Sequence, residues 1–86
     1  QVCDGNLACE GDFQSYLTDA IDLRSVPGEG ELPVRAMLQA MPDKIPVSLE
    51  IRSRAYRERY PDAAERAAEI RSQALSYFER SGLSII

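Results

Sequence analysis

The order of the sequence patterns constrains the fold most, because each of two strand-like segments is followed by a helix-like one. Residues 1–4 read as the end of a strand stopped by Gly5, and residues 46–51 alternate apolar and polar side chains. Two strands joined by a helical crossover lie parallel, and a parallel sheet is normally covered on both faces. Because two helices cannot cover both faces of such a sheet, we predict an α/β chain that is part of a larger protein.

The clearest helical pattern covers residues 63–80. Asp62 and Glu65 have the spacing of a capping box, and Gly82 follows the last helical residue as a C-cap. One apolar stripe is expected to be buried, and it consists of Ala67, Ile70, Ala74, Tyr77 and Phe78. This helix should therefore pack one face against the strands.

Two shorter helices are expected before it. Residues 13–21 follow Asp12, which is a typical N-cap residue, and residues 33–41 begin with Pro33 at a favoured first helical position. The residues between them do not form a regular element, because residues 24–31 contain one proline and two glycines within four positions. Residues 52–60 are expected to add a helical turn before the last helix.

Length and composition limit the function classes. A chain of 86 residues forms one small domain at most, and its net charge of −4 argues against nucleic-acid binding. No apolar run approaches the roughly 20 residues of a membrane span, and no signal peptide is recognisable. Cys3 and Cys9 fit no zinc or redox motif and are expected to be free thiols. We therefore expect a cytoplasmic chain with no membrane partner.

Polar residues that suit metal and sugar chemistry lie where the two strands are expected to end. Gln1, Asp4 and Glu50 carry hard oxygen ligands of the kind that Mg²⁺ and Mn²⁺ prefer. Arg24, in the loop between the strands, could hold a substrate hydroxyl, carboxylate or phosphate. Since active sites of parallel α/β barrels form at the carboxyl ends of the strands, these residues are candidates for one site.

Three segments together resemble a known superfamily. They are Gln-Val-Cys-Asp at residues 1–4, Arg-Ser-Val-Pro-Gly-Glu-Gly-Glu-Leu at residues 24–32, and Pro-Val-Ser-Leu-Glu at residues 46–50. This set is similar to the end of the xylose-isomerase-like sugar phosphate isomerase/epimerase superfamily, which includes hydroxypyruvate isomerases and ketose 3-epimerases. The resemblance implies that residues 1–86 are the C-terminal βαβα portion, with the seventh and eighth strands and helices, of a single (β/α)8 TIM-barrel domain.

The resemblance also implies roles for individual residues. Gln1 would be a metal ligand on the seventh strand, with Asp4 as the fallback because the segment from Asp4 to Arg24 is longer than in related epimerases. Glu50 would bind the divalent ion, Mn²⁺, Mg²⁺ or similar, and would exchange a proton with the substrate through an enediolate. Arg24 would contact the sugar or sugar phosphate. The family's other ligands, a Glu and an Asp, are not in this sequence, so the chain alone is expected to be inactive and to bind metal weakly or not at all.

Two other readings remain. The AP endonuclease branch of the superfamily is faintly echoed at residues 22–24, but it relies on histidine ligands and this chain contains no histidine. The second reading is a non-catalytic small α/β interaction module that binds a partner through residues 63–80. A module should be monomeric and melt cooperatively, whereas part of a barrel should associate with the rest of the barrel or with itself through unpaired strand edges.

Overall fold

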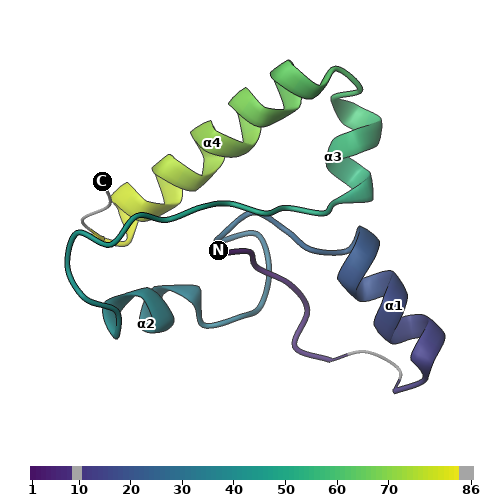
Figure 1. The fold of residues 1–86 in the computed structure, drawn as a ribbon, viewed down its shortest axis with the longest axis horizontal. Coiled ribbons are helices and arrows are strands. Elements are labelled where there is room, and N and C mark those ends of the chain that lie inside the picture. Colours follow the sequence, from purple (N-terminus) through teal and green to yellow (C-terminus); the bar gives the residue numbers. More distant parts are fainter. Residues whose placement is uncertain (9–10, 84–86) are drawn as a thin grey trace.

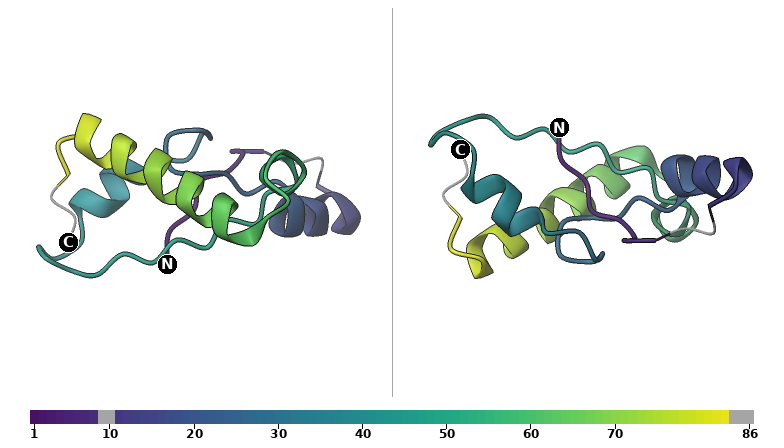
Figure 2. Two further views of the ribbon diagram at one scale, coloured as in Figure 1. Left: turned by 90° about the horizontal axis from the view of Figure 1, so that it is seen from above. Right: turned by 90° about the horizontal axis from the view of Figure 1, so that it is seen from below.

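The computed structural model describes residues 1–8 and 11–83, which form four helices joined by extended segments (Figure 1). The helices, in chain order, are α1 (Phe13–Asp22), α2 (Val34–Gln39), α3 (Arg54–Arg59) and α4 (Ala63–Arg80). The molecule is flat, with extents of 37 × 31 × 18 Å. Both views in Figure 2 separate α4 from the extended segment of residues 46–53, so these two parts form two layers.

The predicted βαβα portion of a TIM barrel is wrong, because the described residues contain no sheet. The two expected strands touch at one parallel bridge, between Val2 and Leu49. The ladder stops there because the Asp4 N–H donates to the carbonyl of Ser25 at 2.7 Å, so residue 4 pairs antiparallel with the loop instead of with residues 46–51.

The helix starts agree with the sequence patterns. The Asp12 carboxylate accepts from the Ser15 N–H at 2.6 Å, and the Asp62 carboxylate accepts from the Glu65 N–H at 2.9 Å. Helix α2 is shorter than expected because Pro33 is its N-cap and Ala40 ends it. Helix α3 starts at an N-cap that was not predicted from the sequence. The hydroxyl of Ser53 accepts from the Tyr56 N–H at 3.2 Å.

The core lies between α4 and the extended segments. Ala74 and Phe78 of α4 are buried against Val26. Packed against this cluster are half-buried side chains from the segment of residues 46–53 and from α4, including Val47, Leu49, Ile51, Ile70 and Tyr77. The predicted alternation of residues 46–51 is therefore confirmed, although Ala67 of the predicted α4 stripe is exposed.

The carboxylate of Asp4 organises the loop of residues 24–32. Asp4 is 2% exposed, and its two oxygens accept from the N–H groups of Gly5 at 2.8 Å, Gly28 at 2.9 Å and Leu32 at 2.9 Å. The loop wraps so closely that a Cβ at Gly30 would lie 2.5 Å from the Asp4 Oδ1. A buried charge that accepts several N–H donors is well compensated, so this cluster holds the loop in one conformation.

Three side-chain contacts join α3 to the loop and to α1. The Tyr56 hydroxyl donates to the Glu29 carboxylate at 2.8 Å; burial first, and then this bond, raises the pKa of Tyr56. On α1, Asp22 accepts from Arg54 at 2.6 Å and from Arg57, both on α3. The bond from Arg57 and then that from Arg54 lower the pKa of Asp22. These contacts fix α3 against both the loop and α1.

Replacing Gly30 with alanine should destabilise the fold by about 1–3 kcal/mol, the usual cost of forcing extra atoms into a packed site. The added Cβ would meet the Asp4 carboxylate at 2.5 Å and the backbone of Gly5 at 2.6 Å. Gly5→Ala is the matched control, because its Cβ would contact only Leu32 at an ordinary 3.6 Å. Urea unfolding measures both free energies, and equal losses in the two variants would contradict this account of the loop.

The Asp22 ion pairs should make stability depend on pH at the acid end. Because the folded-state pKa of Asp22 is lowered, its contribution is present above the unfolded pKa of about 3.9 and is lost as the pH falls through the folded value. Asp22→Asn should therefore flatten the decline in unfolding free energy below about pH 4. Asp43→Asn on an exposed turn is the control. Urea titrations at several pH values would refute the assignment if the Asp22 variant kept the slope of the parent chain.

Candidate functional site

The bridge between Val2 and Leu49 sets which side chains share a face. The Val2 N–H donates to the carbonyl of Ser48 at 2.7 Å, and the Glu50 N–H donates to the carbonyl of Val2 at 3.3 Å. Val2 and Leu49 lie opposite each other, and successive side chains of extended backbone point to opposite faces. Since Leu49 packs on the core, Gln1 and Glu50 emerge on the other face.

A second bridge adds two arginines to this face. Leu23 pairs antiparallel with Ser53, and the Arg24 N–H donates to the carbonyl of Arg52 at 3.0 Å. Arg24 and Arg52 therefore lie directly opposite each other, with side chains on one side. That side is away from the core, because the neighbours of Arg52 in sequence, Ile51 and Ser53, are half-buried and buried respectively.

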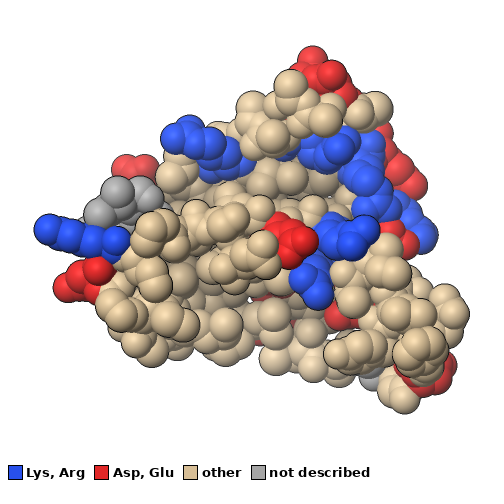
Figure 3. All heavy atoms as spheres, viewed as in Figure 1, with Lys and Arg blue, Asp and Glu red and all other residues tan. Residues whose placement is uncertain are grey.

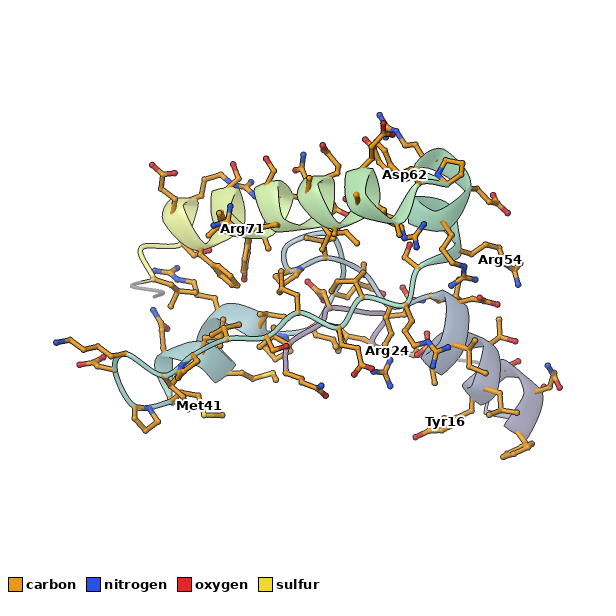
Figure 4. The ribbon with its side chains drawn as sticks, turned by 45° about the horizontal axis from the view of Figure 1, so that its top comes forward. Tyr16, Arg24, Met41, Arg54, Asp62 and Arg71 are labelled. Carbon is orange, nitrogen blue, oxygen red and sulfur yellow. The ribbon has the colours of Figure 1, made fainter. Side chains whose placement is uncertain are left out.

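We call the surface formed by Gln1, Arg24, Glu50 and Arg52 the polar face. Gln1, Glu50 and Arg52 are exposed, and Arg24 is half-buried. Figure 4 shows Arg24 on the side of the segment of residues 46–53 that is away from α4. In Figure 3, an acidic group with basic side chains beside it lies near the centre of the molecule. The structure thus brings three of the predicted site residues, Gln1, Arg24 and Glu50, to one face.

Asp4, the predicted fallback ligand, lies apart from them. It alternates with Cys3 and so points to the core side, where both carboxylate oxygens accept backbone N–H groups. These three bonds occupy most of the lone pairs that a metal would need. Gln1 and Glu50 are therefore the better-placed candidate ligands.

The charges of the polar face are not neutralised within the described part of the chain. Asp22 pairs with Arg54 and Arg57, which leaves it unavailable to the arginines of the polar face. Among residues 1–8 and 11–83, neither Arg24, Arg52 nor Glu50 takes part in an ion pair or a side-chain hydrogen bond. The face therefore presents two guanidinium groups and one carboxylate to solvent.

The donor set suits part of a divalent-metal site. A Gln amide oxygen and a Glu carboxylate are hard oxygen donors. Among the described residues, no group of three or more His, Cys, Asp or Glu side chains could hold an ion. Gln1 and Glu50 could therefore supply at most part of such a site.

Two hollows lie beside the extended segments that carry the polar face. One has a volume of about 260 Å³ and is lined by Gln1, Cys3 and apolar side chains that include Val34 and Met37 of α2. The other, of about 390 Å³, lies between residues 49–51 and α4, on the side opposite the polar face, and Ile70 is among its lining residues. Each is close to the lower end of the size range of small-molecule sites.

Sequence reasoning identified three members of the polar face and missed Arg52. The signal was present, because Arg52 follows Glu50 by two positions and alternation in an extended segment places both on one side. The segment was expected to end at residue 51, so Arg52 was assigned to the following helical turn. Cys3 carries a free, half-buried thiol as expected, and Cys9 lies outside the described residues.

Comparisons with known proteins do not assign the chain to a family. No family model, no curated protein and no solved structure matches it. Within residues 1–8 and 11–83, no helix has both the length and the apolar character needed to cross a membrane. The resemblance to the sugar isomerases and epimerases therefore stays a prediction that depends on the three segments quoted above.

Proposed function

We propose that the polar face supplies part of the active site of a metal-dependent sugar or sugar-phosphate isomerase or epimerase. One observation carries this proposal: two backbone bridges place Gln1, Arg24 and Glu50 on a single face away from the core. The resemblance assigns these three residues to one site, and they come from segments more than 20 positions apart in the sequence. Because the three side chains lie on one face, they could act together in one active site.

Each side chain has a defined task in the proposed reaction. Gln1 and Glu50 would bind Mn²⁺, Mg²⁺ or a similar ion, which when bound supplies the Lewis acidity that makes a C–H bond beside a ketose carbonyl easier to deprotonate. Glu50 carries the only carboxylate of the polar face and would exchange the proton of that carbon. Arg24 would donate hydrogen bonds to a substrate oxygen.

The proposed enzyme includes protein beyond this chain. Large apolar side chains remain exposed on the described surface, among them Leu7 at 68%, Phe13 at 76% and Tyr16 at 65%. Exposed apolar side chains of this kind would suit contacts with further protein, supplied by a longer polypeptide or a second copy. That protein would also supply the missing donors and the second acid–base group. We place the assembled enzyme in the cytoplasm, acting on a small sugar.

Manganese binding to the 86-residue chain tests this function. Mn²⁺ should broaden amide signals of residues near Gln1 and Glu50 in NMR spectra, because a bound paramagnetic ion relaxes nearby nuclei. Binding should be weak, since the ligand set is partial. Glu50→Gln should reduce the affinity by at least about tenfold, the scale of effects that supporting residues already produce in metal sites.

Glu58→Gln on α3 is the control, because Glu58 is also exposed and is outside the polar face. It should leave the broadening unchanged. The proposed function is wrong if Mn²⁺ broadens no signals near Gln1 and Glu50, or if the two variants behave alike. That outcome would favour the interaction module instead.

A further inference from the structure

We propose that Arg24 and Arg52 together form a two-guanidinium site for an anionic group, a phosphate or a carboxylate. Arg52 has no task in the proposed reaction. Anion binding by the two arginines does not depend on the proposed function. The further claim that the bound anion is the substrate rests on the proposed function. The inference therefore names the chemical class of the ligand: a sugar that carries a phosphate ester or an acid group beside the carbons that react.

The first argument is the pairing of the two arginines. Arg24 and Arg52 face each other across an antiparallel backbone contact, joined by the 3.0 Å hydrogen bond from the Arg24 N–H to the Arg52 carbonyl. Side chains at such positions start about 5.5 Å apart, and like charges directly opposite each other are destabilising. An anion between the two guanidinium groups would relieve this repulsion.

The second argument is the shortage of negative charge around them. Asp22, the acidic residue two positions before Arg24, is taken by Arg54 and Arg57 of α3. Glu50 is the one carboxylate of the polar face, and a divalent cation bound to it would make the face more positive. Guanidinium groups match phosphate and carboxylate oxygens in a bidentate geometry, so an anionic ligand suits this surface.

The third argument is that the backbone is held in place directly after each of the two arginines. Ser25 exchanges two backbone hydrogen bonds with Asp4, at 2.7 and 3.0 Å, directly after Arg24. Ser53 is 8% exposed and caps α3 directly after Arg52. Both guanidinium groups therefore extend from constrained positions, which lowers the entropic cost of closing on one ligand.

NMR titration of the metal-free, isotope-labelled 86-residue chain tests the inference. The probes are inorganic phosphate and acetate, each at constant ionic strength set with chloride. The amide and Nε–H signals of Arg24 and Arg52 should shift together and saturate. Arg52→Gln should weaken the binding by at least about tenfold, which corresponds to about 1.4 kcal/mol. Arg35→Gln, on the exposed surface of α2, should leave it unchanged.

Arg52→Lys keeps the charge without the planar guanidinium and should fall between the parent chain and Arg52→Gln. The α4 amide signals report whether each variant is folded, and Arg52→Lys and Arg24→Lys replace Arg52→Gln if that variant unfolds. Tighter phosphate binding would assign a sugar phosphate, and tighter acetate binding a sugar acid. Shifts that do not saturate, or equal weakening by Arg35→Gln and Arg52→Gln, would overturn the inference.

These results are separable from the Mn²⁺ test because no metal is present. Saturable phosphate binding combined with no effect of Glu50→Gln on Mn²⁺ would retain the anion site and reject the isomerase proposal. If phosphate binding does not saturate but Glu50→Gln weakens Mn²⁺ binding, the metal site would be retained and the role of Arg52 rejected.

Discussion

The carboxylate of Asp4 is the interaction on which the rest of the structure depends. It is buried and accepts three backbone N–H groups, two of which belong to the loop that runs from Arg24 to Leu32. An ionised group in that position is tolerated only when its hydrogen bonds are satisfied. The same residue's backbone exchanges two hydrogen bonds with Ser25, so Asp4 joins the N-terminal segment to the loop through both backbone and side chain.

This arrangement connects the fold to the polar face. Because Asp4 holds the loop, Arg24 lies beside the segment of residues 46–53, and because Val2 pairs with Leu49, Gln1 and Glu50 lie on the same side. Helix α4 packs on the opposite side and fixes the alternation of that segment through Leu49 and its neighbours. The polar face thus depends on a few backbone contacts, not on a sheet. Its side chains gain their common direction from backbone alternation alone.

Local signals in the sequence were sufficient for α1 and α4. Asp12 and Asp62 mark helix starts, and these caps act within four residues, so no distant contact can override them easily. The alternation of Val47, Leu49 and Ile51 was also predicted correctly. The sheet was not, because a ladder requires partners from distant segments, and the N–H of Asp4 bonds to Ser25 instead.

The roles of Asp4 in the fold and of Arg52 on the polar face were not predicted, and the two reasons are related. The resemblance drew attention to Asp4 as a ligand, whereas its carboxylate lies so close to the loop backbone that a Cβ at Gly30 would be 2.5 Å from the Asp4 Oδ1. Arg52 was overlooked because the segment was expected to end one residue earlier. In both cases the decisive fact is which face a side chain occupies, and this depends on contacts between segments far apart in the sequence.

Backbone NOEs in the 86-residue chain test the central claim, the pairing that creates the polar face, most directly. The account predicts contacts that join Val2 to Leu49 or Glu50, and contacts that join Arg24 to Arg52 or Ser53. The helical NOEs of α4 provide the internal control for a folded chain. A spectrum in which α4 is formed and either set of contacts between segments is missing would contradict the account.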